Sequence, residues 1–239
     1  MKDKILFVVT SHSELGNTGK LTGYFLSEVT HPWSVLGTQY DIDVVSPLGG
    51  RPPVDGFDLS DPINRQFWDN PEWQDKMSAT LTPDKVNPSE YKAIFYAGGH
   101  GAMWDFPDNA ELAKIASAIY EAGGIVAAVC HGPAGLLNIK LSTGENLVKG
   151  RKITGFTNAE ENLNGTAQVV PFLLQTALEE RGADFVAAAP WSDHVVTDGR
   201  LLTGQNPMAA LDLGKAILKA LETPVDKALD NLHNLMDKI

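Results

Sequence analysis

Hydrophobic residues recur along this chain in short uninterrupted runs, not in alternation with polar residues. Four runs rich in β-branched side chains, and a weaker fifth one, are Ile5–Thr10, Ile42–Ser46, Ala93–Ala97, Ile125–Val129 and Phe185–Ala188. Continuous apolar runs of this length are typical of strands buried on both faces of a parallel sheet. We therefore predict a strand over each run.

Helical patterns fill the intervals between these runs. The clearest begins after Asn109, a helix-capping residue type, and stops at Gly123-Gly124. Its apolar stripe consists of Leu112, Ile115, Ala116, Ile119 and Tyr120. Further patterns predict helices over about 169–181, after Asn206-Pro207, and over a last amphipathic segment at about 225–239.

The alternation of strands and helices predicts one α/β domain spanning residues 1–239. We expect a doubly wound, mostly parallel, flavodoxin-like sheet with helices on both faces. Val195–Thr203, with Asp198-Gly199 at its centre, predicts a hairpin. An irregular insertion at about 48–88, which carries Trp68 and Trp73, suggests a small lid, although a solvent-facing insertion without a role fits its composition equally well.

Charge and cysteine content narrow the range of partners. Among 239 residues, 19 Lys and Arg face 30 Asp and Glu, which gives a net charge of −11. This balance argues against nucleic acid and anionic membranes as partners, because both require clustered basic residues. Ile5–Val9 is too short for a signal segment or a membrane span, so we expect a cytoplasmic protein. One cysteine excludes an intrachain disulfide and fits a reducing compartment.

That cysteine, Cys130, is the first candidate for chemistry. It ends a predicted strand and is followed by His131-Gly132-Pro133, where small neighbours permit the sharp strand-to-helix turn of a nucleophile elbow. A helix N-terminus facing the sulfur would favour an exposed thiolate. The alternative is a buried cysteine that acts as a small inert hydrophobe.

A second candidate segment is Gly98-Gly99-His100-Gly101, which follows the neighbouring predicted strand. Ligands of doubly wound sheets bind at the carboxyl ends of the strands. The backbone amides of Gly99 and His131 could therefore form an oxyanion hole beside the sulfur. A simple tight turn is the alternative, because a Gly-Gly pair after a strand is common.

Nucleotide and metal sites find little support in the sequence. Gly16–Lys20 resembles a truncated phosphate loop but lacks the spacing of its first glycine and the Ser or Thr after the lysine. The six histidines are scattered without ligand spacing. We expect no metal and no organic cofactor, and we assign His12, His194 and His233 to the surface.

These segments together resemble the ThiJ/PfpI superfamily, and within it the glyoxalase III-like branch. The resemblance covers nearly the whole chain up to Pro224 and is carried by Val9-Thr10-Ser11, Glu28 with His31-Pro32-Trp33, Val44-Val45-Ser46-Pro47, Ala97-Gly98-Gly99-His100-Gly101, Ala128-Val129-Cys130-His131-Gly132-Pro133, Ile153-Thr154-Gly155-Phe156-Thr157-Asn158-Ala159-Glu160-Glu161, Val196-Thr197-Asp198-Gly199 and Thr203-Gly204-Gln205-Asn206-Pro207. It implies a class I glutamine amidotransferase-like α/β fold.

The resemblance also implies roles for individual residues. Cys130 would be the nucleophile, His131 the histidine of a catalytic triad and Glu161 its orienting acid, although Glu160 is one residue away. Glu28 would reach the thiol from the first helix. From the residues alone Glu28 reads as an exposed helix position, but its apolar neighbours also allow a partly buried carboxyl with a raised pKa.

The function implied is a glyoxalase III-type lyase, or D-lactate dehydratase, that converts methylglyoxal to lactate without glutathione through a cysteine hemithioacetal. Glutamine hydrolysis is disfavoured, because Ala128 replaces the usual glycine and His131 directly follows the thiol. A small 2-oxoaldehyde is the expected partner, and a homodimer is expected by analogy. Alternatives are a stress-induced holdase chaperone with apolar patches near Trp68 and Trp73, a cysteine-dependent amidase or peptidase, a protein deglycase, and a redox sensor.

Overall fold

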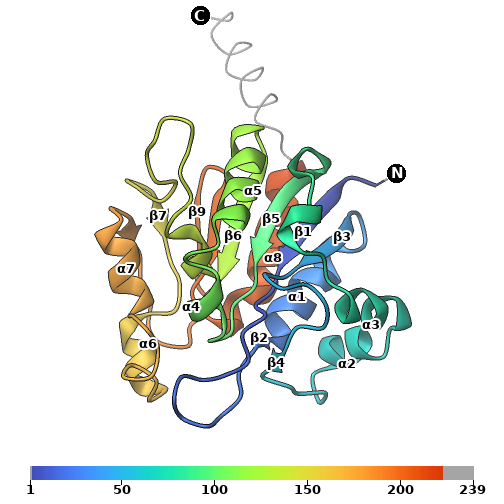
Figure 1. The fold of residues 1–239 in the computed structure, drawn as a ribbon, viewed down its shortest axis with the longest axis horizontal. Coiled ribbons are helices and arrows are strands. Elements are labelled where there is room, and N and C mark those ends of the chain that lie inside the picture. The colour runs from blue at the N-terminus through green and yellow to red at the C-terminus, as the bar shows by residue number, and fades with distance from the viewer. Residues whose placement is uncertain (1, 223–239) are drawn as a thin grey trace, which may run out of the picture.

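The structure is a computed structural model that describes residues 2–222, and its centre is a six-stranded sheet (Figure 1). In order across the sheet the strands are β3 (Asp41–Val45), β1 (Lys4–Val8), β5 (Tyr91–Tyr96), β6 (Ile125–Val129), β10 (Leu201–Gly204) and β9 (Val195–Asp198). The first five run parallel and β9 pairs antiparallel with β10. The predicted parallel sheet, its four strong strands and the hairpin are thereby confirmed.

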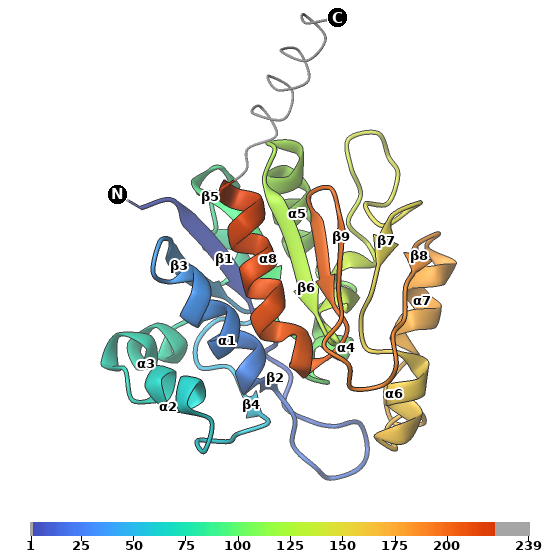
Figure 2. The same cartoon turned by 180° about the vertical axis from the view of Figure 1, so that it is seen from behind.

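Helices cover both faces of this sheet, as predicted. Helix α5 (Ala110–Glu121) lies on one face, while α1 (Leu26–Leu36) and α8 (Ala210–Glu222) lie on the other (Figures 1 and 2). The Asn109 side chain accepts the backbone N–H of Leu112 at 3.0 Å and so begins α5 where the sequence indicated. Asn206 likewise caps the 3₁₀ turn η4 (Pro207–Ala209), which leads into α8.

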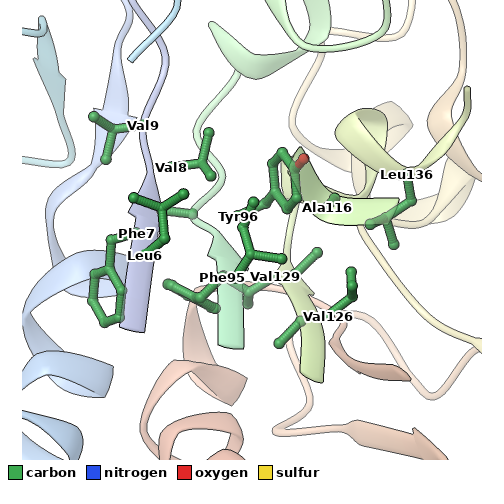
Figure 3. Packing of buried hydrophobic residues seen from close by; sticks show 14 of the residues in the cluster. Leu6, Phe7, Val8, Val9, Phe95, Tyr96, Ala116, Val126, Val129 and Leu136 are labelled. Atoms are coloured by element: carbon green, nitrogen blue, oxygen red, sulfur yellow. The ribbon is translucent and has the colours of Figure 1, made fainter. Parts of the chain in front are cut away.

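The core lies between the sheet and these helices (Figure 3). Consecutive residues Leu6, Phe7 and Val8 are all fully buried, so both faces of β1 are covered. The Phe7 ring packs on Phe95 of β5 with centroids 4.9 Å apart. Each fully buried apolar side chain of this size contributes roughly 1.5–3 kcal/mol. Burial on both faces explains the uninterrupted apolar runs in the sequence.

Two sequence predictions on the far side of the sheet are wrong in extent. The expected strand Phe185–Ala188 shrinks to β8 (Asp184–Phe185), which pairs with β7 (Lys152–Ile153) outside the central sheet. Val186 still donates its backbone N–H to Ile153 O at 2.8 Å, whereas the Ala188 N–H donates to the side chain of Gln205 instead of to a strand. The expected helix over 169–181 begins later, as α7 (Leu174–Glu180). Pro171 lacks an N–H and disfavours helical geometry in the residue before it.

The insertion at 48–88 contains short helices, as expected from its composition. Its elements are β4 (Val54–Asp55), α2 (Pro62–Trp68), α3 (Pro71–Ser78) and η1 (Pro83–Lys85), followed by η2 (Pro88–Glu90). Strand β4 pairs with β2 (Tyr24–Phe25), which leads into α1. Trp33 of α1 packs on Phe67 and Trp73 with centroids 5.1 and 5.7 Å apart. These helices therefore attach to α1, and the lid role stays a prediction.

Two further predictions concern an apolar surface patch near Trp73 and a helix at 225–239. Trp73 is only 6% exposed, so it does not supply the apolar surface patch that the holdase alternative invoked. The expected helix at 225–239 lies outside the described residues. Within residues 2–222, no helix combines the length and the apolarity that a membrane span requires.

Candidate active site

Cys130 sits at the carboxyl end of β6 in a backbone conformation that side chains other than glycine rarely adopt. Its φ is +58°, in the left-handed region. The backbone is held from both sides, because Cys130 N–H donates to Gly204 O at 3.0 Å and Cys130 O accepts from Phe156 N–H at 2.8 Å. The short 3₁₀ helix η3 (Gly132–Leu136) follows. This is the sharp strand-to-helix turn that the sequence predicts at Cys130.

The next side chain, His131, links the sulfur to a carboxylate. Its Nδ1 lies 3.3 Å from Cys130 Sγ, and its Nε2 lies 2.8 Å from Glu161 Oε2. An ionised carboxylate only accepts hydrogen bonds, so Nε2 carries the proton and Nδ1 is free to accept one from the thiol. Burial, reinforced by the neighbouring His100, lowers the pKa of His131 to about 4. His131 is therefore neutral at physiological pH.

The structure distinguishes the two adjacent glutamates of α6 (Asn158–Leu163). Glu161 faces His131, whereas Glu160 turns back to its own helix N-terminus, where its Oε2 accepts the Thr157 N–H at 3.0 Å in a capping box. Glu160 Oε1 accepts from Trp191 N–H at 2.8 Å, on the segment before β9. Glu161 is therefore the glutamate in contact with the predicted triad histidine.

His100, to which the sequence analysis gave no role, binds the same carboxylate. Its Nε2 lies 3.0 Å from Glu161 Oε1, and its ring centroid lies 4.1 Å from that of His131. Thr166 also donates to Glu161. Burial disfavours ionisation of Glu161, but hydrogen bonds from His100 and His131 outweigh it and hold its pKa well below the ordinary value. The only sequence signal for His100 was its place in the glycine loop after β5.

Glu28, near the N-terminus of α1, also lies close to the thiol. It is fully buried, and its Oε2 accepts the Gly98 N–H at 2.7 Å. Oε1 has no well-aligned hydrogen-bond partner among residues 2–222, although the Cys130 thiol is close enough to interact with the carboxyl. Burial raises the pKa of Glu28 to about 8. A helix N-terminus typically contributes only about 0.3–1 kcal/mol in favour of the carboxylate, so burial dominates.

Two glycines make this proximity possible. A Cβ on Gly98 would lie 2.6 Å from Glu28 Oε2 and 2.7 Å from His131 N. Gly99 has a φ of +96°, and a Cβ there would lie 2.2 Å from the carbonyl oxygen of Gly23. Any side chain at either position would push apart the segments that surround the sulfur.

The state of the thiol differs from the sequence expectation. Cys130 is only 3% exposed, and burial, followed by the charge of Glu28, raises its pKa well above the ordinary value. The amides of Gly99 and His131 point to the sulfur and favour ionisation, but they do not compensate for burial. The expected exposed thiolate is therefore wrong, because the short turn η3 and two amides are weaker than desolvation. The thiol requires a base at the moment of reaction.

One group of side chains in this site could hold a cation. The donor atoms of His100, His131 and Glu161 all lie within 4.8 Å of one another. Two imidazoles and a carboxylate are ligands that Zn²⁺ and similar ions accept. Sequence spacing did not indicate this group because its members come from three separate segments. In this structure each of the two histidines is hydrogen-bonded to Glu161.

Fungal proteins are similar to this chain over most of its length. Glyoxalase 3 of Candida albicans is 34% identical over 232 residues, which cover 92% of this chain and 98% of that protein. Glutathione-independent glyoxalase HSP31 of Saccharomyces cerevisiae is 33% identical over 238 residues, with the same two coverages.

Solved structures share the fold as well. Rapid Encystment Protein 24 kDa of Francisella tularensis superposes with a TM-score of 0.88 at 41% identity, covering 92% of this chain and 99% of that one. Glyoxalase III of Candida albicans superposes with a TM-score of 0.84 at 33% identity, covering 91% and 96%. The model of the DJ-1/PfpI family matches residues 21–220. The resemblance found in the sequence is confirmed, and the chain belongs to the DJ-1/PfpI family.

Proposed function

We propose that this protein is a glutathione-independent glyoxalase that converts methylglyoxal to lactate. One observation carries the proposal: the Cys130 thiol lies between a protonatable carboxyl, Glu28, and a neutral histidine that is oriented by Glu161. The names of the two fungal relatives support the same activity. The substrate would be a small 2-oxoaldehyde.

The first step is addition of sulfur to the aldehyde carbon. Ionised Glu28 takes the thiol proton as the S–C bond forms, and the aldehyde oxygen becomes an alkoxide. The amides of Gly99 and His131, which already point to the sulfur, would hold this oxygen. The proton then passes from Glu28 to the alkoxide and completes the hemithioacetal.

The second step moves hydrogen between the two carbons of the substrate. Glu28, again a carboxylate, removes the hydrogen of the former aldehyde carbon as a proton, and the electron pair forms an enediolate. The oxygen on the neighbouring carbon takes the proton of the hemithioacetal hydroxyl. The same carboxyl returns a proton to the neighbouring carbon, which gives a thioester of the 2-hydroxy acid. A pKa of about 8 suits a group that must both accept and return a proton near neutral pH.

The third step hydrolyses this thioester. His131 Nδ1 removes a proton from the attacking water, and the S–C bond breaks as the tetrahedral intermediate collapses. Nδ1 lies 3.3 Å from Sγ, so the same proton can return to the departing sulfur. Glu161 keeps Nε2 protonated and the ring in place. Lactic acid leaves, and the thiol is restored.

The test is lactate formation from methylglyoxal without glutathione. Cys130→Ser and Cys130→Ala should each lower kcat by at least about a thousandfold, because addition of sulfur is lost. His31→Gln, in a histidine–carboxylate pair outside the site, is a matched control that should keep its rate. An inactive wild-type protein, or a Cys130→Ser variant with full activity, would contradict the proposal.

Two further predictions concern the setting of the reaction. We infer a homodimer from the superfamily resemblance, and sedimentation velocity of the full chain measures its mass directly. A cytoplasmic location is the second prediction, and fluorescence microscopy of a tagged full-length chain tests it. Neither prediction enters the catalytic steps above.

A further inference from the structure

The segment between β8 and β9 is fixed by three buried polar side chains that the catalytic steps do not use. Glu160, Gln205 and Asn206 are all fully buried. Each binds the backbone of residues 188–192, through Trp191 N–H to Glu160 Oε1 at 2.8 Å, Ala188 N–H to Gln205 Oε1 at 2.8 Å, and Asn206 Nδ2 to Ser192 O at 2.8 Å. Buried polar groups of this kind fix a backbone conformation when all of them are hydrogen-bonded.

Trp191 occupies a strained position in this segment. Its φ is +62°, in the left-handed region where glycine is favoured. Its side chain is also 43% exposed, so burial of the indole does not explain the strain. Strained residues that the surrounding structure holds in place often serve a site. The hydrogen bond that the Trp191 N–H donates to Glu160 thus secures a defined position for an exposed aromatic ring.

A series of ring contacts joins the Trp191 indole to the reacting groups. The Trp191 ring packs edge-on against Phe156, with centroids 5.6 Å apart and planes at 66°. Phe156 packs on His131 at 4.4 Å, and His131 contacts the sulfur. A continuous line of rings therefore connects an exposed aromatic surface with the nucleophile.

The same line borders the part of the site that reaches solvent. Among Cys130, His131, Glu161 and His100, the side chain of His100 is the most exposed, at 15%. Its ring centroid lies 6.0 Å from that of Phe156. Phe156 thus contacts the rings of both His100 and Trp191, and the indole is the exposed end of this line of rings. Figure 1 shows the segment between β8 and β9 passing α6 at the carboxyl edge of the sheet.

We propose that Trp191 is a specificity-determining residue whose indole forms the outer apolar wall of the approach to Cys130. It favours carbonyl substrates that carry an aromatic or bulky apolar substituent over methylglyoxal, because such a substituent packs against the indole and Phe156. The substrate preference rests on the proposed glyoxalase function. The effect of the Trp191 indole on access to the sulfur does not depend on turnover.

The first test compares phenylglyoxal with methylglyoxal. We expect the ratio of their kcat/KM values to fall about tenfold in Trp191→Gly, mainly through KM for phenylglyoxal, and to stay near wild type in Trp191→Phe. Glycine accepts a φ of +62° without strain, so the variant should fold, which its melting temperature and circular dichroism verify. Phe57→Ala removes another exposed ring, one that packs on Trp68, and should leave the ratio unchanged. An unchanged ratio in folded Trp191→Gly overturns the proposal.

A second test separates this inference from the proposed function. Phenacyl bromide and iodoacetamide each alkylate a thiol: a C–S bond forms, the C–Br or C–I bond breaks, halide leaves and the thiol proton passes to solvent. Mass spectrometry gives the two rates at Cys130 without any turnover. We expect Trp191→Gly to lower the ratio of phenacyl bromide to iodoacetamide several-fold. That result in a protein that forms no lactate would contradict only the glyoxalase function, whereas an unchanged ratio would overturn the role of Trp191.

Discussion

Glu28 interacts with the Cys130 thiol and Glu161 with His131, and their environments drive the ionisation of the two carboxyls in opposite directions. Both are almost fully buried. The pKa of Glu28 rises to about 8, whereas that of Glu161 is held well below the ordinary value. Because burial acts on both carboxyls, it cannot account for the difference. The hydrogen-bond partners decide it.

The partners differ in number and kind. Glu28 receives the Gly98 N–H, and its Oε1 has no well-aligned partner within residues 2–222. Glu161 accepts hydrogen bonds from His100 on Oε1 and from His131 on Oε2, and Thr166 also donates to Oε1. A carboxyl that lacks partners exchanges its proton near neutral pH, whereas one with several donors stays ionised. The first suits proton transfer, and the second suits orientation of His131.

Of the changes that distinguish the two glutamates, removal of the proton carrier Glu28 should have the largest effect. Glu28→Gln keeps the shape of the side chain but cannot accept the thiol proton, so we expect kcat for lactate formation to fall about a thousandfold. Asp105→Asn is a matched control in another mostly buried carboxyl, which binds Thr10 and Ser11 away from the sulfur. It should retain activity. Similar losses in both variants would mean that general destabilisation, not proton transfer, causes the effect.

The same substitution should change how stability depends on pH. Folded Glu28 keeps its proton up to about pH 8, whereas the unfolded chain releases it near the ordinary pKa of 4.5. Between these values the folded state binds more protons, so its free energy of unfolding falls as the pH rises. From pH 5 to 8 the wild type should lose on the order of 3 kcal/mol relative to Glu28→Gln.

Chemical denaturation at several pH values measures this difference. Subtracting the Glu28→Gln curve from that of the wild type removes the contribution of His131, whose pKa is lowered to about 4 and which acts in the opposite direction below pH 6.5. Parallel curves for the two proteins would show that Glu28 ionises normally in the folded state.

The pH dependence of turnover tests the ionisation of Glu28 independently of stability. Glu28 must be a carboxylate to take the thiol proton, so kcat/KM should rise roughly 50-fold from pH 6 to 8 and level off above. His131 stays neutral over this range and adds no second slope. A rate that stays constant between pH 6 and 8 would assign the proton transfer to another group.

The smallest effect should come from removing one of the hydrogen bonds that hold Glu161 in place. His100→Asn removes one hydrogen bond from Oε1 and the ring contact with His131, while Thr166 remains. We expect kcat to fall about tenfold with little change in KM, because His131 is positioned less firmly. Steady-state kinetics give both constants, with His31→Gln as the control. A change confined to KM would place His100 in substrate binding instead.

Local patterns in the sequence predicted the features that depend on neighbours along the chain. The apolar runs predicted four central strands, Asn109 predicted the start of α5, and the small residues around Cys130 predicted its turn. Features that depend on distant segments were missed. His100 meets Glu161 across 61 positions, and Gly99 packs against the distant backbone of Gly23. The register of Glu160 and Glu161 was likewise fixed only by the orientation of α6.

The closeness of Glu28 to Cys130 has a consequence for the lifetime of the protein under oxidative conditions. Peroxide attacks thiolates far faster than thiols, and here the group that would remove the proton is itself protonated at rest. The resting sulfur is therefore a protonated thiol, and its raised pKa keeps the thiolate fraction small. The enzyme should therefore resist irreversible oxidation to the sulfinic acid while it remains reactive toward aldehydes.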